Sequence, residues 1–322
     1  MAKTLDELEL RTLIDAEPAT PRGSSPYEAN ARYLTSLDGF NIKRPPIPAH
    51  MFRAERDRAL AGDASTGLLP LDLSSALGLE YPATTPLILS SYARIRAGET
   101  LSTAFAASAE IYHVIRGSGT TTPDGADGAG DGVSIAWQAR DTFCLPGGSR
   151  VRHRAAADTV LWIATNEPQL RFEGLRPPGP GAAPIRPAFY PMSEVRRRLL
   201  AVYLDPRGAA MPGKSVNLGN VALEESRTTT PSFTLAVNSL VPGEAQRGHR
   251  HNAVAVTLVL SGEGCYSLID GERVDWEPDT VMITPPAAFH SHHNDGRELA
   301  LFLIVQDGGV YYHCRTMGFS FK

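Results

Sequence analysis

The chain has 322 residues, a formal net charge of −4, and 42% hydrophobic and 20% charged residues. This length suffices for two domains with cores of their own, and the weak acidity gives no electrostatic reason to expect nucleic acid or an anionic membrane as a partner. No run of eighteen apolar residues occurs and the first residues lack an apolar signal region, so we expect a cytoplasmic protein. Three widely separated cysteines argue against a disulfide framework.

Helical patterns lie before and between two strand-rich stretches. Leu5 to Ile14 and Tyr27 to Leu37 carry apolar residues at helical spacing, which predicts two helices in an N-terminal extension. Residues 176–184 are rich in proline and glycine, which is typical of an inter-domain linker. Tyr190 to Tyr203 then shows an apolar face at helical spacing, so we expect a helix soon after the linker.

The chain also resembles itself at a fixed offset of 145 residues. The repeated signals are a Thr-Thr-Pro segment, a Gly-Glu pair and a Gly-x-Gly turn, beginning at Thr84, Gly98 and Gly117 and again at Thr229, Gly243 and Gly262. Single Gly-x-Gly matches are common by chance, but one offset shared by all three signals is not. The repeat therefore predicts a duplicated domain.

Each copy contains short apolar, β-branched runs that end at glycine or proline turns, which predicts strands. The first copy has them at Leu87–Ile95, Ile111–Ile115, Val133–Trp137, Thr142–Leu145 and Thr159–Ala164. The second copy has them at Phe233–Leu240, Val254–Leu260, Arg273–Trp276, Thr280–Ile283 and Leu299–Val305. Many short strands at this spacing indicate an all-β sandwich or barrel, and the jelly roll is the form that includes cupins.

Two segments of the first copy are predicted to lie outside its strands. Thr120 to Gly132 is rich in Gly, Asp and Thr, which predicts a flexible hairpin loop that carries no chemistry. Arg152-His153-Arg154 lacks partner residues for a metal site, so its simplest interpretation is an exposed turn.

Five of the nine histidines fall in two short segments of the second copy. His249 and His251 are spaced i, i+2, so on a strand both imidazoles point to the same face. His-x-His alone is usually an ordinary surface pair. Here a second cluster, His290-Ser291-His292-His293, follows Pro285-Pro286 and offers a third imidazole. Imidazole suits Fe, Zn, Cu and Ni, so the two segments together predict a metal site.

These segments resemble the two motifs of the cupin family, and the duplicated chain resembles the bicupins of the gentisate 1,2-dioxygenase-like group. The first motif stands at Pro242-Gly243-Glu244, His249-Arg250-His251 and Gly262-Glu263-Gly264, and the second at Pro285 to Asn294. Most cupins place a glutamate four or five residues after the second histidine, where this chain has Ala255 and Val256. The gentisate-like group and its salicylate- and hydroxynaphthoate-cleaving relatives lack that carboxylate and hold Fe(II) with three histidines.

The resemblance implies an all-β fold of two cupin domains with a helical N-terminal extension and a helical linker. It implies Fe(II) held by His249, His251 and His290, with a small aromatic acid and O2 as substrates and a homo-oligomer (dimer or tetramer) as the assembly. The expected activity is that of a non-haem iron, extradiol-type dioxygenase that cleaves a hydroxylated aromatic carboxylic acid, gentisate- or substituted salicylate-like. Two alternatives stay open: another cupin reaction at the same centre (thiol oxidation, decarboxylation or a lyase step), or a non-catalytic ligand-binding bicupin.

One departure from the family concerns the first copy. Typical gentisate dioxygenases carry the metal in their N-terminal cupin, whereas the repeat offset places Ala104 and Ala106 at the first two ligand positions here and Glu110 at the position of the lost carboxylate. We therefore expect a first cupin without metal ligands and a catalytic second cupin. The predicted domains are an extension at 1–70, the first cupin at 71–175, a linker with its helix at 176–215 and the metal-binding cupin at 216–322.

Residues beside the predicted ligands are candidates for further roles. His292 shares a strand face with the third ligand if the strand continues, which makes it a candidate hydrogen-bond donor or acid–base group, with a solvated rim histidine as the alternative. Arg247 lies two residues before His249 and would share its strand face, and a guanidinium is suited to bind a substrate carboxylate. A surface role is the alternative. Arg250 and His293 are expected to point away, and Asn294 to hold a turn.

Overall fold

A computed structural model describes residues 25–37, 44–124, 134–179, 181–211 and 213–321. The chain divides into two compact units, Met1–Arg44 and Pro45–Lys322. In the first unit the described residues contain helix α2 (Pro26–Asn30), whose N-terminus is capped by the hydroxyl of Ser25. The predicted helix from Tyr27 to Leu37 is therefore wrong beyond Asn30, because the following apolar side chains stay exposed and a short helix without a buried face is not stable. The predicted helix at Leu5–Ile14 lies outside the described residues.

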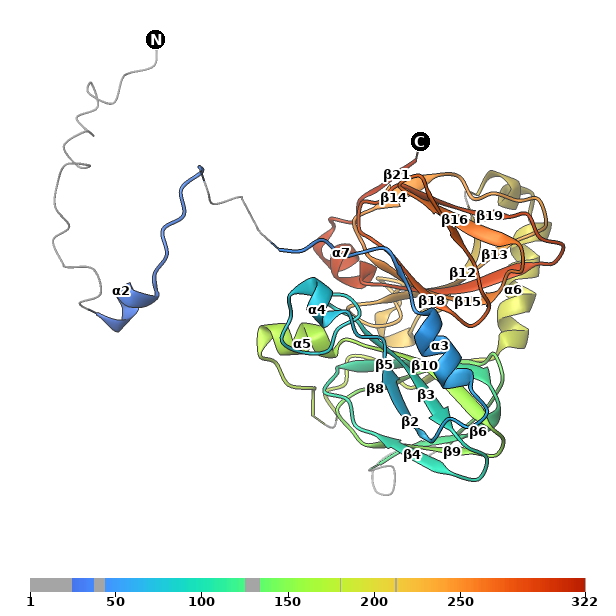
Figure 1. The fold of residues 1–322 in the computed structure, drawn as a ribbon, viewed down its shortest axis with the longest axis horizontal. Coiled ribbons are helices and arrows are strands. Elements are labelled where there is room, and N and C mark those ends of the chain that lie inside the picture. Colours follow the sequence, from blue (N-terminus) through green and yellow to red (C-terminus); the bar gives the residue numbers. More distant parts are fainter. Residues whose placement is uncertain (1–24, 38–43, 125–133, 180, 212, 322) are drawn as a thin grey trace, which may run out of the picture. The chain divides into compact units, whose positions relative to one another are not determined.

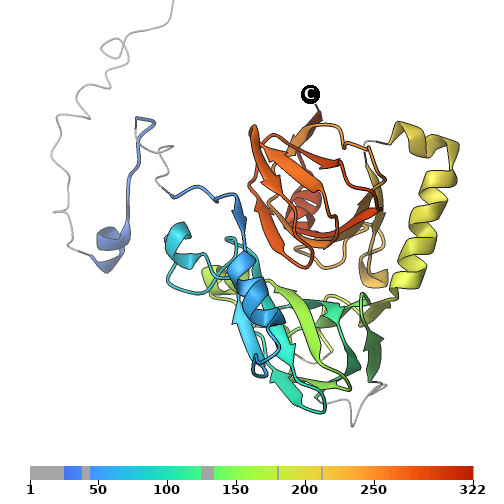
Figure 2. The same cartoon turned by 45° about the vertical axis from the view of Figure 1, so that its right-hand side comes forward.

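The second unit contains two jelly-roll domains, each built from a large and a small antiparallel sheet (Figures 1 and 2). In the N-terminal domain the large sheet has the order β11-β8-β5-β10-β3-β2 and the small sheet β4-β9-β6-β7. Their bounds are β2 (Gly67–Pro70), β3 (Leu89–Ile95), β4 (Thr100–Thr103), β5 (Ala109–Arg116), β6 (Ser118–Pro123), β7 (Ile135–Gln138), β8 (Thr142–Pro146), β9 (Val151–Ala155), β10 (Thr159–Thr165) and β11 (Ala188–Tyr190).

The C-terminal domain repeats this plan. Its large sheet has the order β1-β18-β15-β20-β13-β12 and its small sheet β17-β16-β19-β14-β21. Their bounds are β1 (His50–Met51), β12 (Lys214–Asn217), β13 (Thr234–Leu240), β14 (His249–His251), β15 (Ala255–Ser261), β16 (Cys265–Ile269), β17 (Glu272–Asp275), β18 (Val281–Thr284), β19 (His290–Asn294), β20 (Ala300–Gln306) and β21 (Phe319–Phe321).

Short helices connect and flank the sheets. They are α3 (Arg53–Leu60), α4 (Ser74–Leu77), α5 (Glu167–Glu173), α6 (Met192–Leu204), the 3-10 turns η1 (Pro206–Ala210) and η2 (Val221–Leu223), and α7 (Gly308–Cys314). The predicted linker helix is confirmed as α6, which buries Met192, Val195 and Leu199. No helix of the described ranges combines the length and apolar character needed to cross a bilayer.

The predicted all-β, two-cupin fold is confirmed, and each of the ten predicted strands is present within a few residues of its expected bounds. Two predictions for the first copy are wrong. Thr120 to Pro123 belongs to β6 rather than to a loop, and the remainder of that predicted loop lies largely outside the described residues. His153 is buried in β9, where burial alternates residue by residue as in a half-buried strand, so it is not on an exposed turn. The domain boundaries stay a prediction; β1 precedes the first cupin but pairs with β18 of the second.

The central strands of the two large sheets are buried on both faces. All seven residues of β10 are buried, with Trp162 in a hydrophobic cluster that also contains Val256 of the other domain and Leu161 in a separate cluster inside its own domain. The hydroxyl of Tyr92 donates to the carbonyl of Asp279 across the domains at 2.8 Å. Burial on both faces explains why these strands are continuous apolar runs in the sequence rather than alternating ones.

The interiors of the two domains differ. In the first domain a hydrophobic cluster that includes Tyr112, Phe143 and Trp137 occupies the space between the sheets. In the second domain the corresponding cluster is smaller and gathers around Trp276 and Phe302. The remainder of the second interior is therefore left for polar side chains, and the predicted metal ligands lie there.

Glu110 on β5 is a fully buried acid in the interior of the first domain. Tyr112 donates a hydrogen bond to one carboxyl oxygen, while the other oxygen has no partner within the described residues. Burial raises the pKa of Glu110 to about 8, against an ordinary value of 4.5. Glu110 is therefore expected to stay protonated at neutral pH in the folded protein.

We expect the Glu110→Gln variant to be more stable than the native protein at alkaline pH. The unfolded chain ionises Glu110 near its ordinary pKa, whereas the fold retains the proton to about pH 8, so the native protein loses stability as pH rises from 4.5 to 8. The gain at pH 9 should be on the order of 4 kcal/mol and should nearly vanish at pH 4.5. Urea unfolding at both pH values measures it. The exposed control Glu224→Gln should show no such difference; an equal gain at both pH values would contradict the assignment.

Candidate metal centre

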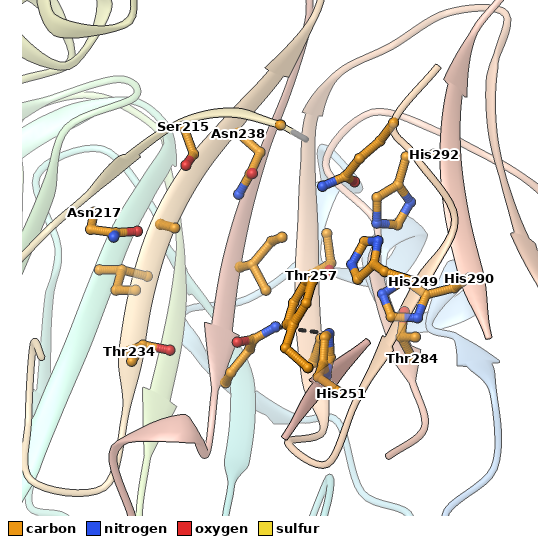
Figure 3. Close-up of a pocket in the computed structure, with 18 of the residues that line it drawn as sticks. Ser215, Asn217, Thr234, Asn238, His249, His251, Thr257, Thr284, His290 and His292 are labelled. Carbon is orange, nitrogen blue, oxygen red and sulfur yellow. Dashed lines mark hydrogen bonds between the residues drawn. The ribbon is translucent and has the colours of Figure 1, made fainter. Parts of the chain in front are cut away.

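The three predicted ligands lie together in the small sheet of the C-terminal domain. His249 and His251 sit on β14 with the intervening Arg250 exposed, and His290 begins β19 directly opposite His249. All three imidazoles are buried, with 5%, 4% and 2% of their surfaces exposed. One nitrogen from each ring lies within 4.8 Å of the others (Figure 3). Strand alternation and the β14–β19 register are thus sufficient to gather the three rings.

Backbone carbonyls fix which nitrogen of each ring faces the centre. Nδ1 of His249 lies 2.9 Å from the carbonyl of Arg247, Nδ1 of His251 2.7 Å from that of Ala253, and Nδ1 of His290 2.9 Å from that of Ala288. Because a carbonyl only accepts, each Nδ1 carries the proton and each Nε2 presents its lone pair. This arrangement is typical of metal-bound histidines.

The electrostatics of the centre suit a cation. Burial lowers the pKa of His249 and His251, and lowers that of His290 to about 3. The rings are therefore neutral at neutral pH, which is the protonation state that binds metal.

The positions of the first domain that correspond to the three ligands lack imidazoles, as expected. The predicted correspondence of Ala104 with His249 is wrong by one residue, however. Thr103 pairs with Val151 as His249 pairs with His290, so Thr103 and not Ala104 occupies the first ligand position. The fixed offset fails here because the turn before β14 is one residue longer than the turn before β4. By the same register, Phe105 rather than Ala106 corresponds to the second ligand.

A cavity of about 380 Å³ opens beside the three imidazoles, a volume within the range of small-molecule sites. It exists because Ala255 and Thr257 stand on β15 where Glu110 and Tyr112 stand on β5 of the first domain. Uncharged polar side chains such as Asn238 and Thr257 line it (Figure 3). Its described lining contains no carboxylate, and its one arginine is exposed Arg227, for which the structure gives no ion pair. The cavity therefore favours a neutral or anionic ligand.

Gln306, at the end of β20, contacts one of the ligand nitrogens. Its Nε2 lies 3.2 Å from Nε2 of His251. Because that ring nitrogen is unprotonated and carries a lone pair, the amide N–H donates to it. A cation bound to His251 would take the same lone pair. Gln306 would then have an amide N–H available to a second ligand at the centre.

His292 lies where the sequence places it. It is 3% exposed, lines the cavity and has Nδ1 2.8 Å from the hydroxyl of Ser267. The solvated-rim alternative is therefore wrong. His293 instead stacks on Tyr266 at 4.7 Å, and buried Asn294 donates 2.8 Å hydrogen bonds to the carbonyls of two neighbouring segments, as a turn-holding residue does.

The guanidinium of Arg247 does not line the cavity. It lies over the ring of Phe321 at 5.1 Å and is exposed, while its backbone carbonyl bonds the first ligand. The expectation of a shared strand face does not apply to it, because β14 begins only at His249. A catalytic role for Arg247 stays a prediction that the geometry does not support.

The sequence interpretation missed Phe319 on the C-terminal strand β21. Its ring stacks on His249 with centroids 4.9 Å apart and planes 16° from parallel, and it lines the cavity. β21 reaches this place by pairing with β14, and no sequence motif near Phe319 predicts that pairing. Thr257 and Gln306 were missed as well, but Thr257 is detectable from the repeat, since it occupies the position of Tyr112.

Comparison with known proteins defines the class first: residues 237–306 match the cupin domain family. Over its whole length the chain shares its fold with the salicylate 1,2-dioxygenase of Pseudaminobacter salicylatoxidans, with a TM-score of 0.70, 14% identity and coverage of 100% of this chain and 99% of the other. Structures of that enzyme include adducts with gentisate. The chain therefore has a two-cupin fold.

Two sequence relatives are 1,2-dioxygenases by name. The chain is 29% identical over 123 residues to a gentisate 1,2-dioxygenase from Ralstonia sp., a match covering 38% of this chain and 30% of the relative. It is 31% identical over 162 residues to a 1-hydroxy-2-naphthoate 1,2-dioxygenase from Nocardioides sp. (strain KP7), covering 49% and 40%. The match thus spans less than half of each relative. The predicted resemblance to the gentisate 1,2-dioxygenase-like family is confirmed, whereas the oligomeric state stays a prediction.

Proposed function

We propose that the protein is an Fe(II)-dependent dioxygenase that cleaves the ring of a hydroxylated aromatic carboxylic acid, with His249, His251 and His290 as the iron ligands. The observation that carries the proposal is the set of three neutral imidazoles whose Nε2 lone pairs converge beside a cavity without a carboxylate. Three neutral ligands leave the charge of a divalent cation uncompensated, which favours an anionic chelating substrate. A phenolate with an ortho carboxylate or hydroxyl is such a substrate.

The residues present fit an iron centre. Imidazole nitrogens with locked tautomers are ligands that Fe(II) accepts, and no fourth protein ligand lies with them in the described residues. A bound Fe(II) would lower the pKa of a coordinated phenol and offer adjoining coordination positions to substrate and O2. In the overall reaction both oxygen atoms enter the product and the aromatic ring supplies the electrons, so no external reductant is needed.

The protein's own groups bind and orient the substrate. The three imidazoles are buried, and the face of Phe319 together with Thr257 shapes the space beside them. His292 offers one polar ring nitrogen to this space. Arg227, the one cation of the described lining, attracts an acid group towards the cavity.

Aerobic turnover of Fe(II)-reconstituted protein tests the proposal. Oxygen uptake and near-ultraviolet absorbance of ring-opened product are measured with gentisate, salicylate, 1-hydroxy-2-naphthoate and 5-substituted salicylates. We expect uptake with at least one ortho-hydroxy acid and none with 4-hydroxybenzoate, which cannot chelate. Uptake with simple thiols alone, or oxalate decarboxylation without uptake, would replace the proposal by another cupin reaction, and binding without any turnover would favour a sensor.

Replacing Gln306 is expected to separate metal affinity from ligand affinity. The native amide competes with the metal for Nε2 of His251, so Gln306→Leu should bind divalent metal up to about 10-fold more tightly, the value of roughly one net hydrogen bond. The affinity of this variant for salicylate should fall, because it lacks the amide N–H that could donate a hydrogen bond to the bound ligand. Competition against a fluorescent chelator and salicylate titration measure the two constants. Weaker metal binding by Gln306→Leu would show that the amide supports the centre instead.

A further inference from the structure

A hydrogen-bonded chain of three side chains ends at His292. Nε1 of Trp276 donates to Oγ of Ser267 at 2.8 Å, and the same oxygen lies 2.8 Å from Nδ1 of His292. The hydroxyl has one proton to donate, and its other neighbour is the sulfur of Met282 at 3.9 Å. A thioether is a weak acceptor, so the proton goes to Nδ1 of His292.

The first domain repeats this chain and resolves the direction of its hydrogen bonds. Nε1 of Trp137 donates to Thr121 at 2.8 Å, and Thr121 lies 2.9 Å from Nδ1 of His153. No sulfur competes here, and the described residues offer Thr121 no other acceptor. Nδ1 of His153 therefore accepts, and its Nε2 carries a proton that it donates to Thr103 at 3.2 Å.

The two chains use the same kinds of groups, an indole, a hydroxyl and an imidazole, but differ at the end of the chain. The residue that receives the proton in the first domain, Thr103, occupies the position of His249 in the second. Nε2 of His292 consequently has no hydrogen-bond partner within the described residues, although the side chain is 3% exposed and faces the cavity (Figure 3). A hydrogen-bonding atom that faces the cavity beside the imidazole cluster and has no partner in the described part of the protein is suited to a ligand.

We propose that Trp276 and Ser267 are positioning residues that hold His292 in the tautomer with its proton on Nε2, which makes this ring the fixed hydrogen-bond donor of the site to an anionic oxygen of the ligand. The tautomer is independent of the proposed function; only the anionic ligand rests on it. A ring with a proton on Nε2 offers no lone pair to the cavity. His292 therefore cannot become a fourth metal ligand, although His290, two residues earlier on the same strand face, presents its lone pair.

The chemistry of the Nδ1 partner explains this opposite behaviour. A carbonyl at Nδ1, as at His290, forces the proton onto Nδ1. At His292 the hydroxyl of Ser267 accepts from an indole and has no other strong acceptor for its own proton within the described residues, so it donates to Nδ1 and the ring proton lies on Nε2. On the same strand, His290 therefore presents an acceptor nitrogen to the cavity and His292 presents a donor nitrogen, because their Nδ1 atoms have different partners.

Nitrogen-15 spectra of the histidine side chains test the tautomer directly. Protein labelled with 15N-histidine and loaded with Zn²⁺ is expected to show His292 and His153 as Nε2–H tautomers, each assigned by the loss of its signals in His292→Asn and His153→Asn. Ser267→Ala should shift only His292, and Thr121→Ala should shift only His153. Ser267→Thr should keep the native pattern, because the first domain already uses threonine at this position. An Nδ1–H signal for His292 in the native protein, or no change in Ser267→Ala, would overturn the proposal.

Ligand binding gives a second readout on the same Zn²⁺-loaded proteins. Salicylate, followed by its fluorescence, should bind Ser267→Ala about 10-fold more weakly than native protein, with Ser267→Thr restoring the affinity and Zn²⁺ affinity unchanged in both. If the expected tautomer is observed but salicylate does not bind the native protein, the positioning role stands and the aromatic-acid function fails. Equal salicylate affinity of native protein and Ser267→Ala would overturn the donor role.

Discussion

Replacing His290 with alanine is expected to abolish both metal binding and turnover while leaving the fold intact. His290 is the one proposed ligand on β19, and its removal leaves two imidazoles on β14. Loss of a residue behind a metal ligand typically costs about 10- to 100-fold in affinity, so loss of the ligand itself should cost more than about 100-fold. Iron content should fall from about one ion per chain to near zero, and far-ultraviolet circular dichroism should stay unchanged.

The matched control for this variant is His293→Ala on the same strand. His293 stacks on Tyr266 and does not line the cavity, so its replacement should leave iron content and oxygen uptake close to native values. Equal iron loss in both variants would indicate damage to β19 rather than removal of a ligand. Full iron content in His290→Ala would remove this residue from the centre.

Replacing Ala255 with glutamate is expected to keep the metal and stop the reaction. Ala255 lines the cavity beside the imidazoles, at the position where the first domain buries Glu110. A carboxylate there would add a fourth, anionic ligand to three neutral ones, which should tighten binding of divalent metal. Turnover should fall by at least about 100-fold, because losing a single stabilising contact to reacting atoms commonly costs that much and here a coordination position itself is lost.

Ala255→Gln is the control, since it has the size of glutamate without the charge. It should leave metal affinity near the native value and lower turnover less than Ala255→Glu does. Chelator competition and oxygen uptake are measured on both variants. An effect shared by both is due to the size of the new side chain, and an effect of Ala255→Glu alone is due to its carboxylate binding the metal. Native turnover in Ala255→Glu would contradict the idea that a vacant carboxylate position is what permits catalysis.

The cluster of three histidines could be predicted from sequence because it depends on the alternation of side chains along β14 and on its short register with β19. His-x-His on a strand places both rings on one face, and His290 follows a proline-marked turn onto the neighbouring strand. Alternation also placed His292 correctly, because β19 continues through Asn294. It failed for Arg247, which precedes β14 and therefore has no strand geometry.

Features that depend on contacts between distant segments could not be predicted. Phe319 reaches the first ligand through the pairing of β21 with β14, and β9 was mistaken for a turn because polar Arg152 and Arg154 flank His153, which is buried. The strand at Arg152 to Arg154 is a different case, since arginines alternating with His153 are themselves typical of a half-buried strand. The Trp–hydroxyl–His chain repeats at offsets other than 145 residues, so the single offset of the repeat does not bring its members together.

The most direct test of the central claim is electron paramagnetic resonance of the nitric oxide adduct of Fe(II)-loaded protein, with and without salicylate or gentisate. Nitric oxide needs a vacant coordination position, and a chelating acid needs two more. We expect an S = 3/2 iron–nitrosyl signal whose shape changes when an ortho-hydroxybenzoate is added and is unchanged by 4-hydroxybenzoate. Absence of the nitrosyl signal, or a signal indifferent to every ortho-hydroxybenzoate, would contradict an open three-histidine iron centre that binds aromatic acids.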